Sequence, residues 1–246
     1  MQVSSGLHPL VITIFGGATP TSQPVSELAR QIMSTMGADI TNPKQGFSDL
    51  VARRRQEDKA ALDYLQTDYL WLDYPDAIVR GNPPYYKDLE ALIGGEVHPK
   101  DTVIDQALAQ MLLELQARLP DTVWYAPLAV GHHADHQIVC SAADRLVQNG
   151  AKVYFYEDFP YVVRREDALQ QRLAELGTPF EPTLVEMSEM LPARIEAALM
   201  YASQVHTNFE NGQALTREME TYTAGIRPVE TVRLERYWVP RLPKDV

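Results

Sequence analysis

Short apolar runs alternate with longer amphipathic stretches along this chain of 246 residues. The runs have the length and the β-branched and aromatic content of strands, and the stretches between them carry apolar residues at helical spacing. We expect strands at 10–15, 69–72, 123–126 and 153–156, and helices at 49–65, 102–119, 136–149, 166–176 and 191–204. This alternation predicts an α/β fold with a mostly parallel sheet, and the length favours a single domain, residues 1–246.

Three connections follow predicted strands and are candidates for a functional site. Segments 16–48 and 74–100 are long and rich in Pro and Gly, and the segment GHHADH occupies 131–136. Ligand sites of open α/β sheets lie outside the carboxyl ends of the strands. We therefore expect these three loops to converge on one edge of the sheet.

Charge and composition narrow the class of partner. The 33 acidic and 22 basic residues give a net charge of −11, which argues against nucleic acid or an anionic membrane surface as the main partner. No stretch reaches the roughly 18 apolar residues of a membrane span, and the N-terminus lacks the pattern of a signal peptide. A single cysteine, Cys140, suggests a reducing compartment, so we expect a cytoplasmic protein.

The segment GHHADHQIV at 131–139 concentrates the groups with chemical potential. His133 and His136 are three residues apart, and Asp135 stands where a helix N-cap is expected. In the first helical turn His136 would stay neutral, as a metal ligand must be, while His133 could polarise a carbonyl or protonate a leaving amine. The plainer interpretation is a histidine-rich surface loop. One histidine cannot hold a catalytic zinc, which normally takes three protein ligands.

Other catalytic signatures are absent from the sequence. There is no H-E-x-x-H, no Cys pair, no G-x-S-x-G and no G-x-x-x-x-G-K-[ST]. Gly16-Gly17 leaves a nucleotide-binding protein as a weak alternative, because two glycines without the full pattern are typical of a simple turn.

An ordered set of segments resembles the PIG-L/LmbE-like zinc-dependent N-deacetylases. The matching segments are TIFGG (13–17), ARRRQEDKAAL (52–62) with Arg54 and Glu57 in R-x-x-E places, YLWLDYPD (69–76), YAPLAVGHHADHQIV (125–139) and ALMYASQ (198–204). The resemblance implies a Rossmann-like three-layer α/β/α fold, a zinc ion, and hydrolysis of the acetamide of an N-acetylated small molecule, a sugar or a similar amide.

The same resemblance implies roles for five residues. His136 would be the metal ligand of its segment, His133 the acid or electrophilic histidine, and Asp135 its orienting neighbour. Arg54 and Asp76 would face the substrate. Their alternative interpretations are an exposed helical arginine that pairs with a nearby glutamate and a turn-forming Pro-Asp.

The defining H-x-D-D segment of that family is not in the sequence. It should precede TIFGG and supply two metal ligands and the general base, but only 12 residues stand there. MQVSSG resembles the last turn of a helix with Gly6 as its cap, so we expect the first strand to be missing and the chain to be N-terminally incomplete. We expect this chain to retain little zinc and to show no amidase activity.

Two functions therefore remain open from the sequence. One is the metal-dependent deacetylase of the family, and the other is a catalytically inactive remnant or carbohydrate-binding module that keeps the fold. The substrate's identity and any homo-oligomer stay undetermined.

Overall fold

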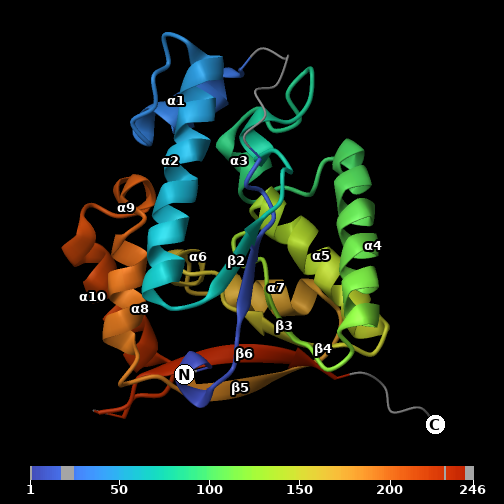
Figure 1. Ribbon diagram of the computed structural model, residues 1–246, viewed down its shortest axis with the longest axis vertical. Coiled ribbons are helices and arrows are strands. Elements are labelled where there is room, and N and C mark those ends of the chain that lie inside the picture. Colours follow the sequence, from blue (N-terminus) through green and yellow to red (C-terminus); the bar gives the residue numbers. More distant parts are fainter. Residues whose placement is uncertain (1, 18–24, 230, 242–246) are drawn as a thin grey trace. The chain divides into compact units, whose positions relative to one another are not determined.

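The computed structural model describes residues 2–17, 25–229 and 231–241. The chain divides into two compact units, each with its own β-sheet (Figure 1). The first unit contains the chain up to Lys87 together with Glu186–Leu234. The second unit contains Asp88–Val185 together with the chain from Glu235 onward.

The first unit has a parallel two-stranded sheet and most of its residues in helices. Strand β1 (Leu10–Thr13) pairs with β2 (Asp68–Trp71), with Leu10 opposite Asp68 and Thr13 opposite Trp71. The remaining elements of the unit are η1 (Val3–Ser5), α1 (Glu27–Thr35), α2 (Pro43–Tyr64), η2 (Ala77–Val79), α8 (Leu191–Leu199), α9 (Ala202–Asn208) and α10 (Gly212–Gly225). Helix α2 connects the two strands and packs against α1 and α8 (Figure 1).

The helices of this unit begin where local chemistry favours a start. The Ser26 hydroxyl accepts a hydrogen bond from the Ala29 N–H at 3.0 Å and caps α1. Pro43 occupies the first turn of α2, where its missing N–H costs nothing. The apolar side of α2 is buried through Phe47, Leu50 and other residues, which holds the helix in place.

The second unit has a four-stranded mixed sheet in the order β3-β4-β6-β5. Its strands are β3 (Val123–Pro127), β4 (Lys152–Tyr156), β5 (Phe180–Glu186) and β6 (Leu234–Pro240). Its helices are α3 (Leu89–Leu92), η3 (Pro99–Asp101), α4 (Thr102–Arg118), α5 (Ala134–Gln148), α6 (Tyr161–Arg164) and α7 (Ala168–Glu175). Strands β3 and β4 are parallel and connected by α5, whereas β6 runs antiparallel to β4.

Helix α5 is fixed at both ends and along one side. It lies beside α4 in the second unit (Figure 1), and Ile138, Ala142 and Leu146 are buried. At its C-terminus Gly150 has φ +84°, its N–H donates to Val147 O, and the next N–H donates to Leu146 O. This is a left-handed glycine cap, of the kind that a glycine directly after the predicted helix 136–149 indicates.

Most predicted elements are confirmed, with changes in bounds and in sheet type. The four predicted strands are present, but the antiparallel β6 makes the larger sheet mixed rather than mostly parallel. The predicted helix at 191–204 is two helices, because Tyr201 has ψ 59° and interrupts it. The connection 16–48 includes α1 and the start of α2, so it is not the long loop that was predicted, although residues 18–24 lie outside the described part.

Two further observations concern the N-terminus and the membrane. Gly6 caps a single 3-10 turn, Val3–Ser5, with φ +77°, as the sequence predicted for a glycine cap. None of the helices in the described part of the chain is long and apolar enough to cross a membrane.

Candidate active site

The loop after β3 ends at His133, which caps the N-terminus of α5. Its Nδ1 accepts a hydrogen bond from the Asp135 backbone N–H at 3.2 Å. The prediction of Asp135 as the N-cap is therefore wrong, since α5 begins at Ala134 and Asp135 lies buried in the first turn. A neutral imidazole that accepts at Nδ1 carries its proton on Nε2. His133 is thereby set up as a hydrogen-bond donor at Nε2.

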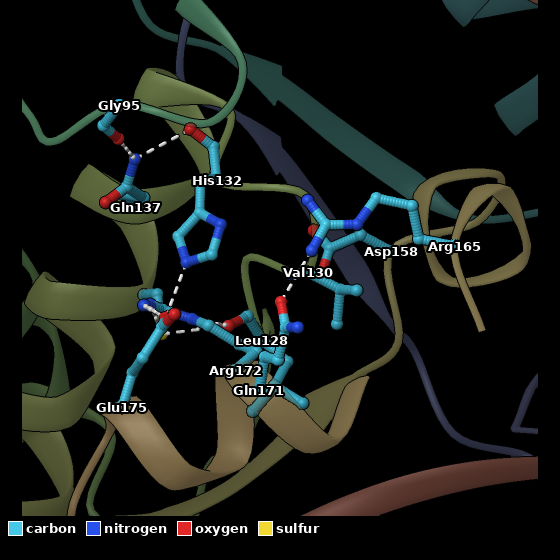
Figure 2. Close-up of polar contacts among 11 residues, drawn as sticks. Gly95, Leu128, Val130, His132, Gln137, Asp158, Arg165, Gln171, Arg172 and Glu175 are labelled. Atoms are coloured by element: carbon cyan, nitrogen blue, oxygen red, sulfur yellow. Dashed lines mark hydrogen bonds and ion pairs between the residues drawn. The ribbon is translucent and has the colours of Figure 1, made fainter. Parts of the chain in front are cut away.

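His136 lies in the first turn of α5, as predicted, and is oriented by a buried carboxylate. Its Nδ1 lies 2.5 Å from Oδ1 of Asp158, whose side chain is 0% exposed. The second carboxylate oxygen of Asp158 accepts from the Val130 N–H at 2.9 Å (Figure 2). A carboxylate in this position favours the tautomer with the proton on Nδ1 and the lone pair on Nε2.

The two imidazoles and one tyrosine form an aromatic cluster. The ring centroids of His133 and His136 are 5.2 Å apart, and Tyr161 lies edge-on to His136 at 5.8 Å and 87°. Tyr161 also packs against Gly131, where a Cβ would come within 2.7 Å of the Tyr161 Cβ. A glycine is needed at 131 for this approach, and it also has φ +87°.

Asp158 is a candidate site residue that was not predicted from the sequence. It follows the predicted strand at 153–156 as the second of two acidic residues, Glu157 and Asp158. Glu157 is buried and binds Arg236 and the Trp238 indole, with 2.8 Å to Trp238 Nε1. The sequence did carry a signal for Asp158, because two acidic residues directly follow the predicted strand 153–156. Side chains that follow the strands of a parallel sheet often belong to its ligand site.

The predicted substrate residues lie in the first unit and contact each other. Arg54 NH1 on α2 is 3.1 Å from Asp76 Oδ2, and Asp76 also caps η2 by accepting from the Ile78 N–H at 3.1 Å. The alternative partner of Arg54, Glu57, instead accepts from the backbone N–H and the hydroxyl of Ser203, at 2.9 and 2.6 Å. Arg54 and Asp76 thus form one ion pair, and His133, Asp135 and His136 form a separate group in the second unit.

Four of the segments that carried the family resemblance are joined through Asp58 in the first unit. Asp58 on α2 accepts from Thr13 Oγ1 at 3.0 Å, from Trp71 Nε1 at 2.6 Å and from the Tyr201 hydroxyl at 2.5 Å. Burial of the Tyr201 phenol, together with this bond to Asp58, raises the pKa of Tyr201. Asp58, one residue after the R-x-x-E motif, therefore joins α2 to β1, to β2 and to Tyr201 at the start of α9.

A zinc ion is what the family resemblance implies, and the donor set can be tested for it. His136 has the chemistry of a zinc ligand, because a buried carboxylate orients its ring. Catalytic zinc normally takes three protein ligands. Within residues 2–17, 25–229 and 231–241, no group of three or more His, Cys, Asp or Glu side chains is arranged to hold a metal ion. The described residues thus do not fit a complete zinc site.

Comparison with known proteins shows that the chain is similar to deacetylases. No model of a known protein family matches the chain. It is 29% identical over 214 residues to a 2'-N-acetylparomamine deacetylase of Niallia circulans, covering 84% of this chain and 76% of that protein. It is also 29% identical over 159 residues to a 2'-N-acetylparomamine deacetylase of Streptomyces fradiae, covering 63% of this chain and about half, 54%, of that protein.

Solved structures give the same class. The zinc-inhibited form of teicoplanin deacetylase Orf2 superposes with a TM-score of 0.79 at 23% identity, covering 100% of this chain and 91% of that one. The deacetylase–bog complex from teicoplanin biosynthesis has a TM-score of 0.76 at 25% identity, covering 100% and 91%. The fold is therefore that of the deacetylases. The chain is homologous to the 2'-N-acetylparomamine deacetylases and to the teicoplanin deacetylases of these structures, in agreement with the resemblance of its motifs.

Proposed function

We propose that this protein binds an N-acetylated amino sugar and hydrolyses its acetamide, releasing acetate and a free amine. This proposal departs from the expectation of no amidase activity drawn from the sequence, because it rests on the arrangement of two histidines in the structure. The observation that carries the proposal is the His133–His136 pair, in which a protein group contacts Nδ1 of each ring. The similarity to deacetylases of 2'-N-acetylparomamine supports the substrate class. The net charge of −11 is compatible with an amino sugar, because protonated amines are attracted to an acidic protein.

The protonation states of the two histidines suit amide hydrolysis. Negative charge develops on the carbonyl oxygen as water attacks, and the nitrogen must gain a proton before it leaves. His133, with its proton on Nε2, can donate to the oxygen or to the departing nitrogen. His136 has its lone pair on Nε2, and Asp158 stabilises this ring if it becomes charged.

A second candidate function is sugar binding without hydrolysis. One observation favours it: the described residues offer no group of three side chains arranged to hold a metal ion, where a catalytic zinc takes three protein ligands. On the same ground we infer that the purified chain carries well below one equivalent of zinc. Elemental analysis of the chain after dialysis measures this, and stoichiometric zinc would contradict it.

Acetate release from 2'-N-acetylparomamine distinguishes the two functions. The 246-residue chain is incubated with this probe, with and without one equivalent of zinc chloride, and acetate and free amine are quantified. We expect release that falls by about 100-fold in His133→Ala. His206→Ala serves as the control, because His206 is exposed on α9 in the other unit, and its removal should leave release unchanged.

A calorimetric titration with the same probe completes the test. If the probe binds but no acetate is released, with or without zinc chloride, the chain is assigned sugar binding and hydrolysis is rejected. Neither binding nor release rejects both. Release that is unaffected by His133→Ala rejects the role proposed for that histidine.

A further inference from the structure

The loop of residues 128–133 has backbone angles that two of its residues, Ala129 and His132, rarely adopt. Three residues of this loop have positive φ: Ala129 at 62°, Gly131 at 87° and His132 at 56°. Such angles are uncommon for residues with a Cβ and persist where surrounding contacts impose them. The contacts that hold the loop therefore also determine where His133 is placed.

Helix α7 holds the start of this loop through a buried arginine. Arg172 is 9% exposed, and its Nε donates to the carbonyl oxygen of Leu128 at 2.9 Å (Figure 2). The same guanidinium lies 3.7 Å from the Cys140 sulfur, and Cys140 Sγ is 3.6 Å from Leu128 O. The Leu128 carbonyl is thus bound from α7 and from α5, immediately after β3 ends.

The same helix holds the end of the loop through Glu175. Its Oε2 lies 2.5 Å from Nε2 of His132 and 3.6 Å from the Arg172 guanidinium (Figure 2). The His132 carbonyl accepts from Gln137 Nε2 at 2.7 Å, and that amide also donates to Gly95 O at 2.8 Å. His132 is therefore held at its ring and at its carbonyl, one residue before His133.

The middle of the loop is tied to the second histidine. The Val130 N–H donates to Asp158 Oδ2, while Asp158 Oδ1 contacts His136 Nδ1. A displacement of Val130 would therefore change the orientation of the carboxylate that orients His136. Both histidines depend on one loop, and α7 binds that loop at both ends.

We propose that Arg172 and Glu175 of α7 are positioning residues for the His133–His136 pair, a proposal that rests on the proposed function for its consequence in catalysis. Arg172 fixes the loop where it leaves β3, and Glu175 fixes the left-handed residue next to His133. Neither side chain needs to touch substrate, because each acts through the backbone that carries the histidines.

Glu175 gives the decisive test, because its side chain is 46% exposed and its removal should leave the protein folded. The full chain is labelled with ¹⁵N-histidine, and the ring nitrogen resonances of His133 and His136 are recorded for Glu175→Ala, Glu175→Gln and Gln170→Ala. Gln170 is exposed on the same helix and provides the control. The melting temperature should fall by less than about 4 °C in each variant.

The expected result is a change in the His133 and His136 resonances in Glu175→Ala and no change in Gln170→Ala. Glu175→Gln should restore the original spectrum, because its amide oxygen can accept from His132. Since Gln also removes the negative charge, restoration separates positioning from electrostatics. Turnover of 2'-N-acetylparomamine should fall by about 10- to 100-fold in Glu175→Ala, mainly in kcat, and recover in Glu175→Gln.

Two spectral results would overturn the proposal: unchanged His133 and His136 resonances in Glu175→Ala, or a Glu175→Gln spectrum that stays altered. These outcomes are independent of catalysis. If the unsubstituted chain releases no acetate, the proposed hydrolysis fails while the histidine spectra still decide whether α7 positions the pair.

Discussion

Helix α2 of the first unit and the loop 128–133 with the start of α5 in the second unit both concentrate polar side chains, but they use them differently. On α2, Arg54, Glu57 and Asp58 each bind a partner on another element, and Asp58 accepts three hydrogen bonds. In the loop region the protein's contacts to His133 and His136 set which ring nitrogen carries the proton. Polar groups on a regular helix can stabilise tertiary structure, whereas the polar contacts around the left-handed loop orient two imidazole rings.

The largest loss of stability is expected from substitution of Asp58, which joins α2 to β1, β2 and Tyr201. Asp58→Ala would leave the donors of Thr13, Trp71 and Tyr201 without their acceptor, and we expect a loss of about 2–4 kcal/mol in the free energy of unfolding. Urea denaturation measures this. Asp63→Ala, which removes an exposed partner of Lys59 on the same helix, should cost much less stability, because water screens that pair. Equal losses would show that the Asp58 contacts do not stabilise this unit.

A somewhat smaller change in the free energy of unfolding is expected from the titration of Cys140. This residue contacts the loop 128–133 and is 3% exposed. Burial raises the pKa of Cys140 from 9.0 to about 11. Well below pH 9 the thiol is protonated in both the folded and the unfolded protein. Between pH 9 and 11 the unfolded chain loses this proton while the folded chain keeps it, so stability falls as the pH rises.

The contribution lost between pH 8 and pH 11 should be about 2 kcal/mol. It is measured as the fall in unfolding free energy of the unsubstituted chain minus the fall in Cys140→Ser, which lacks the thiol titration. Identical pH profiles in the two proteins would mean that the space under the loop admits water.

The smallest contribution to stability is expected from the Arg54–Asp76 ion pair. Its side chains are 35% and 17% exposed, so water screens the attraction between them. A double-mutant cycle with Arg54→Ala and Asp76→Ala should give a coupling energy of about 0.5–1 kcal/mol. The prediction that Arg54 also contacts substrate adds a second measurement. Arg54→Ala should weaken binding of 2'-N-acetylparomamine, whereas an unchanged affinity would leave the pair with a structural role only.

The elements of the fold could largely be predicted because they depend on short-range patterns. Apolar runs indicated β3 and β4, helical spacing indicated α5, and a glycine after the last turn indicated the cap at Gly150. Strands β5 and β6 were missed, although Tyr237, Trp238 and Val239 of β6 are residue types that favour strands. The antiparallel pairing of β6 with β4 made the sheet mixed, and strand direction is not encoded in the apolar pattern of one strand.

The sequence therefore determined which residues are candidates for chemistry, and the tertiary structure decided what they contact. The spacing of His133 and His136 ahead of a helix was visible in the chain, because three residues span one helical turn. Asp158 could not be assigned from the sequence, since it lies 22 residues away and reaches His136 only through the parallel pairing of β3 and β4. Packing likewise paired Arg54 with Asp76 rather than with Glu57. Local periodicity arises from backbone geometry within a few residues, whereas the choice of a polar partner depends on which elements are packed together.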